Sequence, residues 1–152
     1  LSTSPALADD YLYMVCKVKG RNTITNLTSG HVQDKKDVED YVMFKVDLSK
    51  SLFRNNRNPE WDRISVIGNT IVQDKKISRE GFSARVKGVL PLNLPGPIST
   101  DSWFKNTIEY QVIKTKGDCR KIDASMWKSL LLNDETSNPS NCSAPLSITC
   151  CF

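Results

Sequence analysis

The chain has 152 residues, of which 39% are hydrophobic and 25% are charged, proportions that are typical of a globular domain with its own core. Its 21 Lys and Arg residues against 17 Asp and Glu residues give a formal net charge of +4. Because the basic residues are scattered among acidic ones, the charge pattern does not require a polyanionic partner, and no apolar run reaches the roughly 20 residues of a membrane-spanning helix. We expect an N-terminal tail over residues 1–10 and one disulfide-stabilised domain over residues 11–152.

The first third of the chain predicts two strands separated by polar segments. Residues 21–30 are rich in Asn and Thr and predict a loop, and the charged residues 31–39 predict a short helix. Residues 42–48 alternate between apolar and polar side chains and predict the second strand. The first strand, residues 11–19, has an apolar face made of Leu12, Met14, Cys16 and Val18.

The middle of the chain predicts a hairpin and a further strand. Residues 53–59 are typical of a turn-rich loop. Gly68 and Asn69 lie between two strand-like runs, as in a tight hairpin turn. Residues 82–90 alternate and predict another strand.

The last third predicts two more strands and the one helix with a clear pattern. Residues 91–97 contain three prolines, which exclude regular structure, and residues 100–104 predict a capped turn. Residues 108–112 and 146–152 alternate as strands. A helix over residues 123–133 has Asp123 as a favoured N-cap and an apolar face made of Met126, Trp127, Leu130 and Leu131.

Together these elements predict an α+β fold that is mostly antiparallel β. We expect one twisted sheet or sandwich of about six or seven strands, with the late helix packed on it and disulfides stapling it. The five-residue string VQDKK occurs at residues 32–36 and again at residues 72–76. Two copies are too few for a repeat protein, and they suggest two similar charged turns that lead into strands of one sheet.

The five cysteines favour an extracellular, disulfide-stapled domain. Cys16 and Cys150 each lie on the apolar face of a predicted strand, so neighbouring first and last strands would allow a Cys16–Cys150 bond and leave Cys119 to pair with Cys142. Cys151 is then the odd thiol, either an alternative partner for Cys16 or the link of a disulfide-bonded dimer.

Two further patterns fit a secretory history. Asn26 and Asn141 lie in glycosylation sequons, and Ala6-Leu7-Ala8 is similar to a leader cleavage site. We therefore expect a secreted glycoprotein.

Catalytic motifs do not emerge from the sequence. His31 is the single histidine and lies in a polar stretch, and neither a nucleophile elbow nor a phosphate-binding loop is present. The cysteines lack the spacing of a zinc site. We expect no enzymatic activity, no cofactor and no metal.

Two segments are candidate binding surfaces. Arg54, Arg57 and Trp61 form a basic, aromatic cluster that could hold phosphate or stack on a base, or could be an ordinary loop anchored by Trp61. The second candidate is an exposed apolar surface that consists of Leu92, Leu94, Ile98, Trp103 and Phe104.

The early strand that carries Tyr11, Tyr13 and Cys16, the charged segment, the following antiparallel strands and the terminal cysteine resemble the ribonuclease-like secreted fungal effectors. In that family a disulfide joins the first and last cysteines. The resemblance implies a virulence protein that binds host targets and often lacks catalytic residues. Tyr13 lies three residues before Cys16, whereas the family has its aromatic residue two before.

Three functions follow as hypotheses. The leading one is a secreted, non-enzymatic effector that works by binding another protein. The second is an RNA-binding or ribonuclease-like protein that uses Arg54, Arg57 and His31, although nucleic acid is the less expected partner. The third is a small-lipid carrier whose sheet encloses an apolar pocket.

Overall fold

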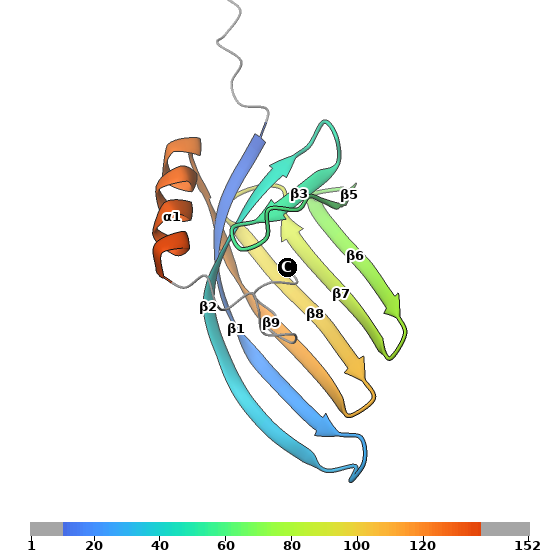
Figure 1. Cartoon of the computed structure of the whole chain (residues 1–152). Helices are drawn as coiled ribbons and strands as arrows, with labels where there is room; N and C mark the ends of the chain where they lie inside the picture. The colour runs from blue at the N-terminus through green and yellow to red at the C-terminus, as the bar shows by residue number, and fades with distance from the viewer. Residues whose placement is uncertain (1–10, 138–152) are drawn as a thin grey trace, which may run out of the picture.

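The computed structural model describes residues 11–137, and within this range nine strands form one antiparallel sheet that curls into a nearly closed barrel (Figure 1). One helix of this part packs on the outside of the sheet. The elements are β1 (Tyr11–Asn26), β2 (Val32–Asp47), β3 (Leu52–Asn55), β4 (Asp62–Arg63), β5 (Ser65–Ile67), β6 (Thr70–Arg79), β7 (Phe82–Pro91), β8 (Gly96–Asn106), β9 (Glu109–Ile122) and α1 (Ala124–Ser137).

Strand order explains how the sheet closes. The strands follow one another as β4-β3-β2-β1-β9-β8-β7-β6-β5, so β4 and β5 are the two ends of the sheet although they are consecutive in sequence. Only Ile64 separates them, and it is buried while its N–H donates to the carbonyl of Ser51 at 3.0 Å. The prediction of a mostly antiparallel sheet with a late helix is confirmed, but the expected six or seven strands are nine, and they form a barrel.

The first hairpin is much longer than the sequence pattern indicates. The loop predicted for residues 21–30 and the helix predicted for residues 31–39 are wrong, because β1 runs to Asn26 and β2 starts at Val32. Residues 13–26 of β1 pair with β9 throughout, so backbone hydrogen bonds to a distant strand override the weak local propensities. Both VQDKK copies lie within strands, β2 and β6, and not in turns.

The turn predicted for residues 100–104 is also wrong, since these residues lie in the middle of β8. The hairpin at Gly68-Asn69 is confirmed between β5 and β6. The strand predicted for residues 146–152 lies outside the described residues.

Two glycines let β1 and β9 approach each other closely. A Cβ atom on Gly20 or Gly117 would collide with a backbone carbonyl of the facing strand, from Lys114 or Lys17 respectively. Only glycine fits at such positions, where the backbones of two strands approach each other closely.

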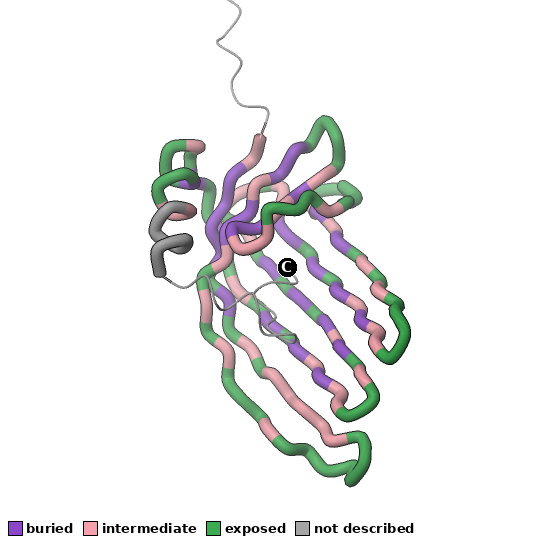
Figure 2. The backbone as a smooth tube through the Cα atoms, viewed as in Figure 1, coloured by how far each residue is buried: buried purple, intermediate pink, exposed green. Residues whose placement is uncertain are grey.

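The inner and outer faces of the sheet each contribute to the core. Buried residues alternate with exposed ones along the strands, as Figure 2 shows. Inside, the rings of Phe44 and Phe53 stack with their centroids 5.6 Å apart. Outside, α1 covers β1 and β2, where Trp127 is 4% exposed and contacts Tyr13.

The start of α1 agrees with the sequence. Asp123 is the N-cap, since its Oδ1 accepts the N–H of Met126 at 2.7 Å. The helix continues past the predicted end at Asn133 to Ser137.

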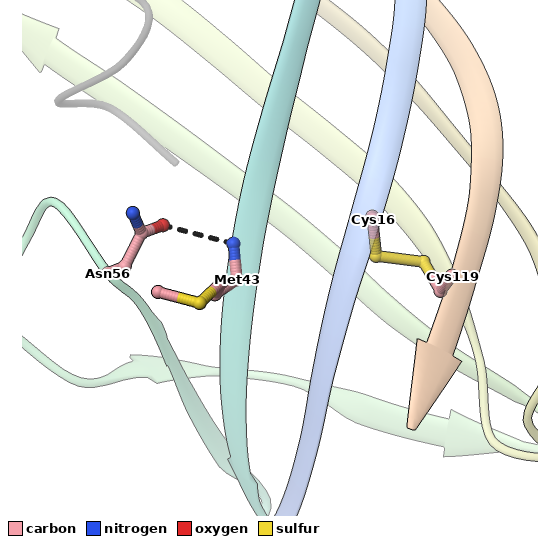
Figure 3. The surroundings of a disulfide bond; sticks show 4 residues. All are labelled: Cys16, Met43, Asn56 and Cys119. Carbon is pink, nitrogen blue, oxygen red and sulfur yellow. Dashed lines mark hydrogen bonds between the residues drawn. A yellow bond between two sulfur atoms is a disulfide. The ribbon is translucent and has the colours of Figure 1, made fainter. Parts of the chain in front are cut away.

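A disulfide joins Cys16 on β1 to Cys119 on β9 (Figure 3). The predicted pairs Cys16–Cys150 and Cys119–Cys142 are therefore wrong, although both Cys16 and Cys119 are disulfide cysteines as expected. The neighbour of the first strand is β9, in which Cys119 lies directly opposite Cys16 with a Cα–Cα distance of 4.0 Å. The candidate cysteines Cys142, Cys150 and Cys151 lie outside the described residues.

Candidate ligand cavity

A cavity of about 60 Å³ lies inside the barrel, between β1, β2, β8, β9, the end of β3 and the segment that follows it. Val38, Asp40, Val42 and Arg57 are only half-buried, so the cavity opens toward solvent on the β2 side. Its apolar walls are formed by Val18, Val38, Val42, Phe44, Ile98 and Ile113, and its polar walls by Asp40, Asn55, Arg57, Thr100 and Thr115. An apolar enclosure with a few converging polar groups is the usual composition of a small-molecule site.

The open side of the cavity carries an ion pair. Arg57 donates from Nη1 to Asp40 Oδ2 at 2.7 Å and from Nη2 to Asp40 Oδ1 at 2.9 Å. This two-bond geometry fixes the plane of the guanidinium group, and both side chains keep partial contact with water at 22% and 32% exposure. The pair therefore places opposite charges at the entrance while the walls behind it are apolar.

Asn55 brings a buried polar group to the cavity wall. The residue is 1% exposed, and its Oδ1 accepts the N–H groups of Arg57 and Asn58, both at 2.8 Å. These two bonds fix the orientation of the amide, and its Nδ2 then has no hydrogen-bond partner within the described part of the chain. A buried donor without an acceptor costs about 1–3 kcal/mol, which a ligand oxygen at this position would recover.

The interior next to the cavity is also polar. Thr100 and Thr115 hydrogen-bond to each other through their hydroxyl groups. On the same inner row, across Gly88 from Thr100, Gln73 is 1% exposed and neither its Nε2 nor its Oε1 has a partner among the described residues. Ser102 Oγ, one inner row further along, is likewise buried without a partner in this part of the protein. Such groups are rare in a barrel that is filled only by its own side chains.

The predicted apolar surface is not assembled. Ile98 and Phe104 point into the barrel and are 3% and 2% exposed, whereas Trp103 alternates with Phe104 and points outward. Leu92 and Leu94 pack against the inner core. The strand alternation of β8, unexpected from the sequence, divides these residues between two faces.

The predicted basic cluster is divided in the same way. Arg57 lines the cavity, while Arg54 lies on the outer face with its Cζ 5.7 Å from the centre of the Trp127 ring. Trp61 stacks on Tyr11, with 6.1 Å between the ring centroids.

The remaining predicted residues lie away from the cavity. His31 is exposed in the turn of the long hairpin, nine residues along the chain from Asp40, which corresponds to roughly 30 Å of strand. Asn26 ends β1, and its Oδ1 accepts the N–H groups of Thr28 and Ser29 in that turn. The second sequon, at Asn141, is outside the described residues.

Sequence reasoning missed Asp40, Asn55 and the two threonines of the cavity. One signal was available: Val38, Val42, Phe44 and Val46 form a period-two apolar run in which Asp40 is the only charged member. A charge at an inward-facing strand position indicates either a partner or a site.

Within residues 11–137, no helix has the length and apolar character needed to cross a membrane. Comparisons of the chain with models of known protein families, with curated proteins and with solved structures found no match.

Proposed function

We propose that this protein binds a small amphipathic molecule in the barrel cavity. The observation that carries the proposal is the buried Asn55 Nδ2, a donor without an acceptor among the described residues, in the wall of an otherwise largely apolar cavity. Of the three functions expected from the sequence, this one corresponds to the carrier of a small lipid-like molecule. The ligand has an apolar part that fits between Val18, Phe44 and Ile98, and an oxygen that accepts from Asn55.

The size of the cavity limits the ligand. Sites for drug-sized molecules occupy about 300–1,000 Å³. The cavity of about 60 Å³ accommodates only a few ligand atoms, so a larger ligand extends past the Asp40–Arg57 pair into solvent. Its polar end is then placed against these two charges, which favours a polar or zwitterionic head over a wholly apolar molecule.

The test is native mass spectrometry of the protein purified from its natural source, comparing the wild type with Asn55→Asp. In its ionised form the aspartate keeps both acceptor bonds of the turn and removes the Nδ2 donor, so occupancy by the co-purifying molecule falls about tenfold or more. Because the position is buried, circular dichroism of the variant checks that it folds. Equal occupancy in the two proteins would contradict the role of Asn55.

Xenon provides a second readout that needs no knowledge of the ligand, since small apolar cavities bind it. We expect xenon to shift the NMR methyl signals of Val18 and Ile98 in the wild type and in Val32→Phe, but not in the cavity-filling variant Val38→Phe. Both substitutions are on β2, and only Val38 lines the cavity. A wild type without bound molecule and without xenon shifts would refute the proposal.

A contact with a partner protein, the leading expectation from the sequence, is a second candidate. It is supported by Val66 and Ile67, which are 43% and 63% exposed on β5 at one end of the sheet. Exposed apolar residues on a terminal strand favour pairing with another chain. If a binding partner is isolated, Ile67→Lys should weaken its binding about tenfold, and Ile108→Lys, at a distant exposed turn, should leave it unchanged.

A secreted location stays part of the proposal, because disulfides such as Cys16–Cys119 form mainly in oxidising compartments. The ribonuclease-like alternative has less support, since Arg57 is engaged by Asp40 and His31 lies on a distant turn.

A further inference from the structure

The outer face of the barrel gathers basic side chains that are scattered in the sequence. Strand register places, in one row across the sheet, Asp74 on β6, Lys87 on β7, Asp101 on β8, Lys114 on β9, Arg21 on β1 and Asp37 on β2. The Asp74 carboxylate is bound by Arg85 through two hydrogen bonds. The next row contains Ser99, Lys116 and Lys19. The named residues of both rows are exposed, and the row between them, with Gln73, Gly88, Thr100 and Thr115, faces the interior, so both rows face outward.

These rows line a groove of about 780 Å³ on the outside of the sheet. Among its lining residues are five basic and two acidic side chains, a net charge of +3 from a chain whose total is +4. The charged lining residues are Lys19, Arg21, Asp37, Lys87, Asp101, Lys114 and Lys116. Gly20 and Gly88 belong to the inward-facing row between these two outer rows, so only their backbone contributes to the floor of the groove.

Three of the lysines in the groove are available for an anion. Lys19 and Arg21 have acidic neighbours, Glu39 at 3.7 Å and Asp37 at 3.6 Å. In contrast, Lys87, Lys114 and Lys116 are exposed and make no ion pair with any residue that the structure describes. Strand geometry separates Lys87 from Lys114 by about 10 Å and Lys114 from Lys116 by about 7 Å, a spacing suited to successive charges of a linear polyanion.

We propose that this groove binds a linear sulfated polysaccharide. The charge complementarity favours a chain with several anionic groups, because each lysine that neutralises a sulfate releases a counterion. A single-stranded nucleic acid is less suited, since none of the described residues that line the groove is aromatic and base stacking would be lost. A flat membrane surface cannot follow a concave groove.

The experiment is calorimetric titration of the whole protein with heparin at several salt concentrations. We expect heparin to bind and Lys87→Gln/Lys114→Gln/Lys116→Gln to bind about tenfold more weakly at 0.15 M salt, with a log–log salt dependence reduced by about 2. Asp101→Asn removes a negative charge between two of the lysines, so it should strengthen binding. All four positions are exposed, so the variants keep the fold.

The matched control is Lys50→Gln/Lys105→Gln/Lys128→Gln, which removes the same charge at exposed positions outside the groove. If this control weakened heparin binding as much as the groove variant did, the effect would be one of net charge and the proposal would be wrong. Tighter binding of a single-stranded oligonucleotide or of anionic phospholipid vesicles than of heparin would also overturn it. If desulfated heparin bound with unchanged affinity, sulfate would not be the group recognised and the proposal would also be wrong.

Discussion

The two levels of the barrel interior differ in what fills them. At the disulfide end, Met14, Phe44 and Phe53 are at most 1% exposed and the level is almost entirely apolar. Toward the other end, Gln73, Ser102 and Thr115 occupy equivalent inward positions, and Gln73 and Ser102 lack partners within the described chain. The first level stabilises the fold, whereas the second retains unsatisfied polar groups that destabilise the ligand-free protein. The cavity lies where the two levels meet, since Phe44 and Asn55 line it from the first level and Thr100 and Thr115 from the second.

Loss of the disulfide should have the largest effect on the apolar level. Cys16 and Cys119 are 103 residues apart, and the chain-entropy model gives about 4 to 5 kcal/mol for a loop of this length. We expect Cys16→Ala/Cys119→Ala to lose this amount of unfolding free energy, measured by urea denaturation. The wild type treated with reductant serves as the comparison, and a loss below about 1 kcal/mol would show that the barrel closes without this bond.

Truncation of an aromatic ring in the core should cause the second-largest loss of unfolding free energy. Phe53 is fully buried and stacks on Phe44, so Phe53→Ala should cost about 3 to 4 kcal/mol through lost burial and the cavity that remains. Thermal denaturation of Phe53→Ala beside Phe82→Ala, which is partly exposed near the other end of the barrel, measures the contrast. Equal losses in both variants would mean that the two levels do not differ.

Replacement of a buried polar side chain that has no hydrogen-bond partner in the described part of the chain should raise the free energy of unfolding. Gln73→Met keeps the length of the side chain and removes two buried polar atoms, so it should stabilise the ligand-free protein by about 1 kcal/mol. Urea denaturation checks the sign. A loss of stability would show that water or another group already satisfies Gln73.

The smallest effect concerns pH at the turn between β2 and β3. The Ser49 hydroxyl donates to Asp47 Oδ1 at 2.8 Å, and this bond, aided by the Lys50 N–H, holds the pKa of the Asp47 carboxyl below its ordinary value of 3.8. A lowered folded-state pKa means that the contribution to stability is present above the unfolded pKa and is lost as pH falls through the folded one. NMR titration should show a higher Asp47 pKa in Ser49→Ala, and an unchanged pKa would assign the shift to the backbone alone.

Local patterns were sufficient where packing and propensity agree. The alternation in residues 11–19 and 82–90, the Gly68-Asn69 turn and the Asp123 cap all predicted the right element. Local patterns were insufficient for residues 21–39, whose polar composition is typical of a loop or a helix. These residues form strands because β1 pairs with β9 and β2 pairs with β1. Because β8 was not recognised as a strand, the candidate surface from Leu92 to Phe104 combined residues of opposite faces.

The amino-acid sequence by itself determined the antiparallel character of the fold, the late helix and the involvement of Cys16 and Cys119 in disulfide bonding, because period-two alternation, capping and cysteine content are local properties. Only the tertiary structure decided which cysteines pair, that the sheet curls into a nearly closed barrel, and that Asp40, Asn55 and Arg57 meet at one cavity. It also brought Lys87, Lys114 and Lys116 into one groove. The physical reason is that each of these features depends on strand order and register, which arise from contacts between residues far apart in the chain.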